Sequence, residues 1–272
     1  MDVEQLKNQL RHYGLKPNFT YGQNFLLDEI VLEDIVDAAG VTTQDTVLEI
    51  GPGIGNLTER LCQRAGFVLS VEKDPKFFPI LKSVKKDHKE NFRFEIGDIL
   101  ETNFQKLLPP GPYKVVANIP YYITGKILQM LLAAERKPAT ITVLTQKEVA
   151  QNIIAGPGKL SILAISVQLF GEPKLLMKVP AKSFYPAPKV DSAVLEIKLF
   201  EKPKYDIDEK KFFKVLKACF AGKRKQLHNT LVNNLNLPKE QALKILEDLK
   251  ITPAARPQEL SIEQWVELVK KI

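Results

Sequence analysis

The chain has 272 residues, of which 44% are hydrophobic and 26% charged, and its formal net charge at neutral pH is +7. This length predicts one large or two modest domains, and the composition excludes disordered, collagen-like and disulfide-stapled proteins. Residues 1–12 are charged from the second position and lack an apolar core, so we expect no secretory signal. The longest nearly apolar run, 160–170, is too short to cross a bilayer. We therefore expect a cytoplasmic protein with no membrane role, in which Cys62 and Cys219 are reduced thiols.

From residue 46 to 198, short β-branched runs alternate with longer helical patterns. We predict buried strands at 46–50, 67–72, 92–98, 113–118 and 139–145, and helices at 57–65, 76–86, 125–135 and 146–155. This alternation favours parallel strands with right-handed crossovers, which give an open α/β sheet with helices on both faces. Runs 174–180 and 193–200 follow without an obvious crossover helix, so we expect an antiparallel pair at one edge.

The pattern changes after Phe200. The segment 201–208 is charged and contains proline, which is typical of a linker. We predict that the rest is helical. The first helix carries an apolar stripe made of Phe212, Val215, Leu216, Cys219 and Phe220. Three further helices are predicted at 225–235, 241–249 and 261–269. Ser261, followed by Gln264 three residues later, matches a capping box. We therefore expect an α/β domain over 1–200 and a small all-helical domain over 201–272.

Positive charge is concentrated in the predicted helical domain. Residues 201–272 hold 15 Lys and Arg against 10 Asp and Glu, and 210–225 carries seven basic residues and no acid. Such a field attracts polyanions, and nucleic acid is the first candidate. A solvated helix face that only keeps the protein soluble is an equal alternative.

A glycine-rich loop follows the first predicted strand of the sheet. Gly51, Gly53 and Gly55 alternate with other residues where open α/β sheets bind ligands, and glycine lets the backbone approach a ligand closely. The GxGxG spacing differs from the GxGxxG of dinucleotide-binding folds, which weakens a phosphate-cradle interpretation. A turn that merely connects strand and helix remains an alternative.

Two acidic residues strengthen the prediction of a ligand. Glu72 ends the next predicted strand, 21 residues after Gly51, where a carboxylate can accept hydrogen bonds from both hydroxyls of a ribose. Asp98 ends the third, where it can accept the adenine amine or simply cap a helix. Together these features predict a pocket for an adenosine-like ligand. Because the loop has no P-loop lysine and acids flank it, S-adenosylmethionine suits the pocket better than ATP or NAD.

The fourth predicted strand ends in Asn118-Ile119-Pro120-Tyr121. An amine lying over the Tyr121 ring could donate one hydrogen bond to the Asn118 amide oxygen and another to the Ile119 carbonyl. These bonds would turn its lone pair toward a methyl donor, so catalysis would rest on positioning and electrostatics without a side-chain base. The alternative is a strand-to-helix turn with a surface tyrosine.

Several motifs that occur in order over about residues 19–200 resemble the rRNA adenine dimethyltransferase family, specifically its small-subunit, kasugamycin-sensitivity type. They are 22–26 (GQNFL), 47–58 (VLEIGPGIGNLT), 96–98 (IGD), 118–124 (NIPYYIT), 146–150 (QKEVA) and 184–192 (FYPAPKVDS), with looser similarity at 220–231 and 255–265. The resemblance implies a Rossmann-like S-adenosylmethionine-dependent methyltransferase sheet with an antiparallel edge, followed by a small C-terminal all-helical domain.

The resemblance also implies an activity and a set of site residues. The activity is dimethylation of the exocyclic amines of two adjacent adenosines near the 3′ end of small-subunit rRNA, within an immature ribosomal subunit. The cofactor residues would be Asn24, Leu26, Gly51, Gly53, Glu72, Asp98 and Asn118, and the catalytic residues Asn118, Tyr121 and Phe184. Tyr121 and Phe184 would sandwich the extruded adenine. The basic residues expected to contact RNA phosphates are Lys223, Arg224 and Lys225.

The chain departs from the family pattern at two places. Tyr122 stands where the family commonly has asparagine, and 151–163 lacks the arginine and tyrosine often found there. Both departures concern the rim of the target pocket rather than the cofactor.

Other functions remain open at this point. The related macrolide-resistance methyltransferases modify large-subunit rRNA with the same chemistry, and a non-catalytic RNA-binding assembly or transcription factor could keep the fold. The scattered histidines and the two cysteines have no metal-ligand spacing, so we expect no metal. Nothing in the sequence demands a dimer, and we expect a monomer.

Overall fold

The computed structural model describes residues 1–222 and 225–272, apart from the Phe19 side chain. The chain folds into two compact units, a larger one of Met1–Ala150 and Glu172–Leu199 and a smaller one of Gln151–Gly171 and Phe200–Ile272. The expected single boundary after residue 200 therefore misses one segment. The apolar run that the sequence analysis left unassigned is helix α7 (Ile162–Phe170), and its buried side chains join the core of the smaller unit.

The larger unit begins with a segment that the sequence analysis did not assign. It comprises α1 (Val3–His12), the 3-10 turn η1 (Phe19–Tyr21), β1 (Phe25–Leu26) and α2 (Glu29–Ala38). The elements that follow are β2 (Thr46–Ile50), α3 (Asn56–Arg64), β3 (Phe67–Glu72), η2 (Pro75–Phe77), α4 (Phe78–Asp87), β4 (Phe92–Ile96), η3 (Phe104–Lys106), β5 (Lys114–Asn118), η4 (Tyr121–Ile123), α5 (Thr124–Ala133), β6 (Thr140–Gln146), α6 (Lys147–Ile153), β7 (Gly171–Val179), η5 (Ala181–Ser183), β8 (Phe184–Tyr185) and β9 (Ser192–Leu199).

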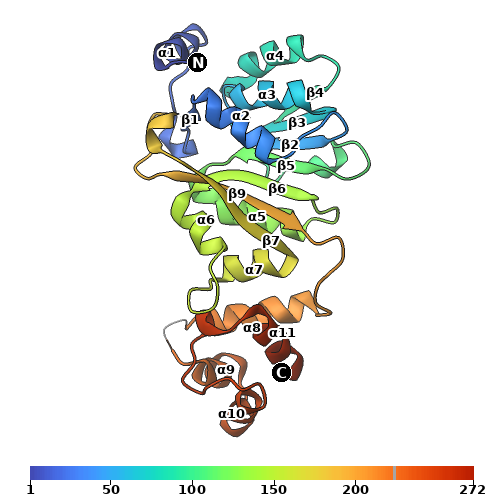
Figure 1. The fold of residues 1–272 in the computed structure, drawn as a ribbon, viewed down its shortest axis with the longest axis vertical. Helices are drawn as coiled ribbons and strands as arrows, with labels where there is room; N and C mark the ends of the chain where they lie inside the picture. The colour runs from blue at the N-terminus through green and yellow to red at the C-terminus, as the bar shows by residue number, and fades with distance from the viewer. Residues whose placement is uncertain (223–224) are drawn as a thin grey trace. The chain divides into compact units, whose positions relative to one another are not determined.

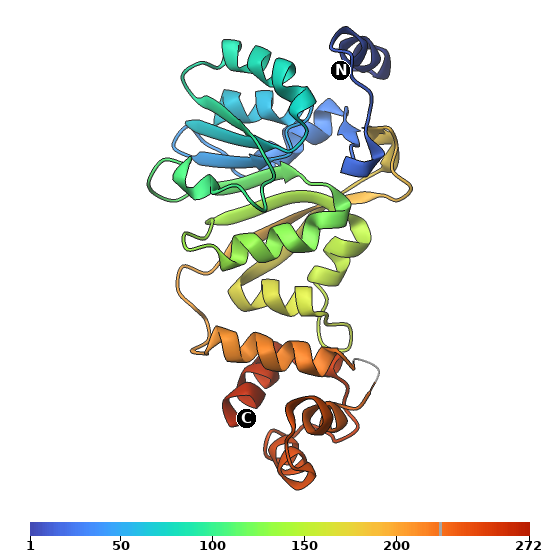
Figure 2. The same ribbon diagram turned by 180° about the vertical axis from the view of Figure 1, so that it is seen from behind.

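The main sheet has seven strands in the order β4-β3-β2-β5-β6-β9-β7. Neighbouring strands from β4 to β6 are parallel, whereas β9 runs antiparallel to β6 in a register from Thr140↔Lys198 to Gln146↔Ser192. This confirms the predicted α/β sheet with an antiparallel edge. Figures 1 and 2 show α2 and α3 on one face of the sheet and α5 on the other. A separate two-stranded sheet pairs β1 with β8.

One strand is not buried as predicted. β4 lies at the edge of the sheet, so Phe92 is buried while Arg93 and Glu95 are exposed. The strand ends at Ile96, and Asp98 therefore lies in the turn beyond it. Successive side chains of a strand point to opposite faces of the sheet, and the alternating burial shows that only one face of β4 is well covered.

The smaller unit is helical, as predicted. After α7, its elements are α8 (Glu209–Phe220), α9 (Leu227–Leu235), α10 (Lys239–Asp248), η6 (Pro257–Glu259) and α11 (Ile262–Lys271). The core surrounds the fully buried Trp265. Four residues of the predicted stripe are buried there, namely Phe212, Val215, Leu216 and Cys219, and the fifth, Phe220, is partly buried against the same core. Of the helices within the described ranges, none is long and apolar enough to cross a bilayer.

The capping box of α11 provides a test of the helical unit. The Ser261 side chain accepts a hydrogen bond from the Gln264 N–H, and the Gln264 side chain accepts one from the Ser261 N–H. We expect Ser261→Ala to lower the free energy of unfolding by about 1 kcal/mol, because one helix donor loses its partner. Urea denaturation would measure this loss, and an unchanged stability would show that the cap contributes nothing.

Candidate functional site

A pocket opens at the carboxyl ends of the central parallel strands. It encloses about 910 Å³ of space, including solvent at its mouth. All seven predicted cofactor residues line it: Asn24, Leu26, Gly51, Gly53, Glu72, Asp98 and Asn118. The order β3-β2-β5 explains this convergence, because the ends of β3, β2 and β5 lie side by side where the strand order reverses.

The glycine loop forms one wall of this pocket. Gly51 and Gly53 have φ angles of 69° and 53°, in the left-handed region that favours glycine. A Cβ placed on Gly51 would meet nothing within 4 Å, so its missing side chain leaves open space at the pocket. A Cβ on Gly53 would lie 3.3 Å from the Phe25 ring, which places the loop closely against the N-terminal segment.

Glu72 joins the end of β3 to the glycine loop. Its Oε2 accepts a hydrogen bond from the Gly53 N–H at 2.9 Å, and its Oε1 accepts one from the Asp74 N–H at 2.8 Å. The residue is only 6% exposed, and burial raises the pKa of its carboxyl. Because a carboxylate offers about four acceptor positions, capacity remains for hydroxyl donors in the pocket.

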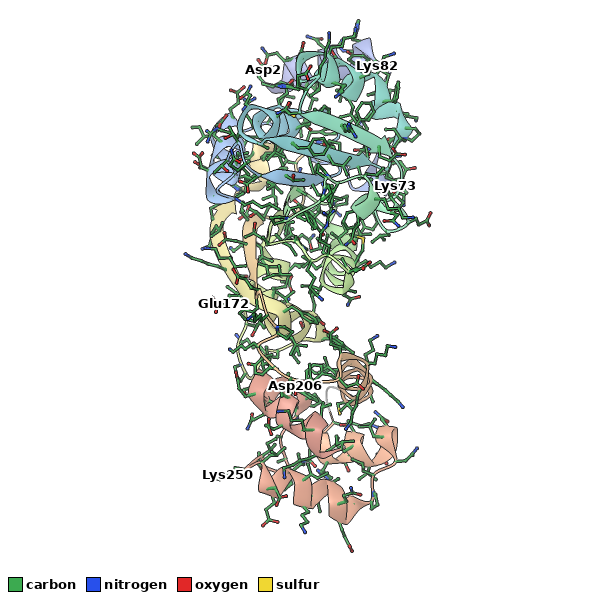
Figure 3. All side chains as sticks on the ribbon, turned by 90° about the vertical axis from the view of Figure 1, so that its right-hand side faces the viewer. Asp2, Lys73, Lys82, Glu172, Asp206 and Lys250 are labelled. Atoms are coloured by element: carbon green, nitrogen blue, oxygen red, sulfur yellow. The ribbon has the colours of Figure 1, made fainter. Side chains whose placement is uncertain are left out.

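Asp98 has a partner that the sequence analysis missed. Lys73, half-exposed at the outside of the larger unit in Figure 3, places its Nζ 2.7 Å from Asp98 Oδ2. Asp98 Oδ1 accepts a hydrogen bond from the Leu100 N–H at 3.0 Å. The hydrogen bond from Lys73 holds the pKa of Asp98 below its ordinary value. Both Asp98 oxygens therefore have partners, and Lys73 itself lines the pocket.

Besides Lys73, the sequence analysis missed an acidic group, Glu49 on β2. It lines the pocket although it is 1% exposed. Its Oε2 accepts hydrogen bonds from the hydroxyls of Thr58, at 2.7 Å, and Ser70, at 2.6 Å. Burial raises the pKa of Glu49 to about 7. The single acid within the apolar run 46–50 was the available signal.

Asn118 stands at the end of β5 with its amide fixed. Its Nδ2 donates a hydrogen bond to the Asn24 carbonyl oxygen at 3.2 Å. No donor from residues 1–222 or 225–272 reaches its Oδ1. The side chain therefore presents an acceptor at the pocket, which is the orientation that an amine donor needs.

The residues after Asn118 take two different directions. Pro120 and Tyr122 line the pocket, whereas Tyr121 does not. The Tyr121 hydroxyl is hydrogen-bonded to the Ser192 hydroxyl at 2.6 Å, and burial raises its pKa. Tyr122 is 57% exposed, and a Cβ on Gly22 would lie 3.3 Å from its ring. The departure from the family pattern at Tyr122 therefore concerns the predicted cofactor pocket as well as the rim of the target pocket.

Phe184 lies in the core and does not line the pocket. It pairs with Leu26 in the small β1–β8 sheet and is 4% exposed. The ring packs in the hydrophobic cluster that includes residues of α2 and α3. Phe184 is therefore a packed core side chain in this structure.

The predicted RNA-contacting residues are only partly described. Lys223 and Arg224 lie outside the described residues, and Lys225 is exposed. The other lysines of the 210–225 run lie on α8 opposite its buried stripe, and all are exposed: Lys210, Lys211, Lys214 and Lys217. Within the described parts of the chain, no three His, Cys, Asp or Glu side chains form a group that could hold a metal.

Comparison with known proteins identifies the family. The model of the ribosomal RNA adenine dimethylase family matches residues 14–272. The chain belongs to this family. The predicted family resemblance is thereby confirmed across both compact units.

Three relatives match this chain over at least nine tenths of its length. The chain is 42% identical over 268 residues to a ribosomal RNA small subunit methyltransferase A of Dehalococcoides mccartyi, covering 98% of this chain and 92% of that protein. A crystal structure of a dimethyladenosine transferase from Plasmodium falciparum is 28% identical with a TM-score of 0.77, covering 90% and 95% of the two chains. The 23S rRNA methyltransferase ErmE is also 28% identical, with a TM-score of 0.72 and coverage of 91% and 99%.

The raised pKa of Glu49 predicts how stability depends on pH. The folded protein keeps a proton on Glu49 up to about pH 7, whereas the unfolded chain releases it near the ordinary value of 4.5. This stabilisation is complete below the unfolded pKa and is lost as the pH rises through the folded pKa, with a total on the order of 3 kcal/mol. Buried Glu72 acts with the same sign.

We therefore expect Glu49→Gln to flatten the fall in unfolding free energy between about pH 4.5 and 7. Urea denaturation across this range would measure the slope. Glu95→Gln, at an exposed position on β4, is the matched control and should keep the wild-type slope. Equal slopes for wild type and Glu49→Gln would contradict the assignment.

Proposed function

We propose that this chain is an adenine dimethyltransferase that uses S-adenosylmethionine to methylate small-subunit rRNA. Family membership and the 42% identical small subunit methyltransferase A support this function. The observation that carries it is the Asn118 side chain, whose Nδ2 is spent on the Asn24 carbonyl while its Oδ1 stays available. The target is proposed to be two adjacent adenosines near the 3′ end of the rRNA, within an immature subunit.

The pocket fits S-adenosylmethionine on three points. Glu72 keeps acceptor capacity for ribose hydroxyls, and the open space beside Gly51 lets the ligand approach the backbone. Asp98, whose pKa lies below its ordinary value, is a carboxylate at neutral pH and can accept a hydrogen bond from the adenine amine. When bound, S-adenosylmethionine supplies an electrophilic methyl group on its positively charged sulfur.

The chain's own residues would then position the target amine. Asn118 Oδ1 accepts one hydrogen bond from the amine, and the Ile119 carbonyl, fixed before Pro120, accepts the other. These two acceptors aim the nitrogen lone pair toward the pocket. The reaction then needs positioning and electrostatic stabilisation more than a strong base.

Tyr121 and Phe184 are proposed to stack on the two faces of the extruded adenine. The Tyr121 ring is held at the end of β5 by its hydroxyl. Phe184 is covered in this structure, so a base can reach its ring only if the two-residue strand β8 or its neighbours shift. This requirement makes Phe184 the less accessible of the two rings.

We propose residues 201–272 as the part that contacts RNA. Exposed lysines along α8 and the exposed Lys225 give this part a positive surface, and the sequence adds two further basic residues, Lys223 and Arg224. A monomer in the cytoplasm is the proposed working form. The likeness to the 23S rRNA methyltransferase ErmE favours large-subunit rRNA as the second candidate substrate.

A methyl-transfer assay tests the activity and the substrate together. We expect labelled methyl groups to pass from S-adenosylmethionine to immature small subunits, and not to large subunits, ending in dimethyladenosine. Asn118→Ala should lower the rate about 100-fold, because a preorganised polar group is lost. Glu72→Ala should raise the cofactor dissociation constant about tenfold or more. Glu95→Ala, exposed and outside the pocket, is the control.

Full activity of Asn118→Ala would contradict the positioning mechanism. Labelling of large subunits alone would replace the proposed substrate by the second candidate. An unchanged cofactor titration for Glu72→Ala would remove that residue from the site.

The basic run offers a separate test of RNA binding. Replacing Lys223, Arg224 and Lys225 by Ala should weaken binding to small subunits and lower the slope of log affinity against log salt by about 2 to 3. Cofactor affinity should not change. The matched control removes the same charge from exposed positions of the larger unit, by Lys82→Ala, Lys86→Ala and Lys89→Ala together. Equal binding by the two triple variants would show that the 223–225 charges have no specific role.

A further inference from the structure

The turn that carries Tyr121 is tied to the antiparallel β6–β9 pair. Ser192 is the first residue of β9, lies opposite Gln146 of β6 and is 0% exposed. Its hydroxyl lies 2.6 Å from the Tyr121 hydroxyl. A side chain of β9 therefore holds the far end of a ring that follows β5 in the sequence.

A second pair of hydroxyls holds the backbone of the same turn. Thr124 donates a hydrogen bond from its hydroxyl to the Tyr121 carbonyl at 3.2 Å. The same hydroxyl lies 3.0 Å from that of Thr145 on β6, and both threonines are buried. Tyr121 is thus held at its carbonyl by Thr124, which is bonded in turn to Thr145 of β6, and at its hydroxyl by Ser192 of β9.

The anchor on β9 is itself fixed by the preceding residue. Asp191 Oδ1 accepts a hydrogen bond from the Ala181 N–H at 3.1 Å, and the Asp191 carbonyl accepts one from the Lys147 N–H at 3.1 Å. These bonds join the start of β9 to the segments that follow β7 and β6. Ser192 therefore projects from a backbone that is held on two sides.

The Tyr121 hydroxyl has no use in stacking, because a base stacks on the face of an aromatic ring and needs only the ring. A ring without an anchor would turn about its two side-chain torsions. The partly buried Tyr121–Ser192 hydrogen bond limits that motion, so the ring keeps one angle relative to Asn118. A small loss of alignment in a site that works by positioning costs rate rather than affinity for the methyl donor.

We propose that Ser192 is a positioning residue for methyl transfer, which it supports by holding the Tyr121 hydroxyl and hence the ring on which the target adenine stacks. This inference rests on the proposed function. Ser192 touches neither cofactor nor target. It acts through Tyr121 alone, and that separates it from a residue that only stabilises the sheet.

A double-mutant cycle tests this inference. Ser192→Ala and Tyr121→Phe each remove one hydroxyl of the pair, and Tyr121→Phe keeps the stacking ring. We expect each variant to lower kcat on immature small subunits about tenfold, with little change in the dissociation constant of S-adenosylmethionine. The double variant should be no slower than the slower single variant, because both changes break the same interaction.

The control is Ser166→Ala, which removes a buried hydroxyl bonded to the Ile162 carbonyl in the smaller unit and should keep the wild-type kcat. Thermal denaturation of every variant shows whether it folds, and Tyr121→Phe carries the test if Ser192→Ala does not. Two results would overturn this inference alone, provided that the wild type is active. One is an unchanged kcat in Tyr121→Phe. The other is a loss of kcat in the double variant equal to the product of the losses in the two single variants. A wild type that transfers no methyl group to either ribosomal subunit overturns the proposed function and the inference together.

Discussion

The hydrogen bond from the Gly53 N–H to Glu72 is the interaction on which the site depends. It connects the loop after β2 to the end of β3, and both contribute to the same pocket wall. The bond requires the loop to turn back with positive φ angles, and glycine alone allows this at low cost. It also places the buried Glu72 carboxyl group beside the glycine backbone, so one contact fixes both the course of the loop and the position of an acceptor in the pocket wall.

The polar groups beneath the carboxyl ends of the strands serve the same purpose. A buried polar group is costly unless it is hydrogen-bonded. Glu49 is satisfied by Thr58 and Ser70, and Thr124 by Thr145. These bonds join α3 to β2 and β3, and the turn after β5 to β6. The core in this region gives up some apolar packing, and in return the loops around the pocket have defined positions.

Much of the fold could be predicted from the sequence, because local patterns mark strands and helices. The ends of β2, β3 and β5 follow from β-branched runs that stop at Gly51, Glu72 and Asn118, and parallel pairing brings such ends together. Family motifs added Asn24 and Leu26, which also line the pocket. Helix α7 escaped because its even apolar content gave no amphipathic period.

Contacts between distant segments could not be predicted in the same way. Nothing near Asp98 announces its ion pair with Lys73, and nothing near Tyr121 announces Ser192, which lies 71 positions further along the chain. The burial of Phe184 likewise depends on pairing between β8 and β1. Such contacts depend on how the chain returns to the sheet, and a local pattern of residue types does not contain that information.

The division of the chain has a practical consequence for dissecting it. The polypeptide enters the helical unit twice, first at 151–171 and again from Phe200 onward. Ala164, Ile165 and Leu169 of α7 are buried within the core of that unit. A fragment that stops at residue 200 would keep α7 without the helices that cover these side chains. It would therefore expose an apolar surface that favours aggregation. A clean separation of the two units therefore calls for two cuts and a short splice between Ala150 and Glu172, rather than a single truncation.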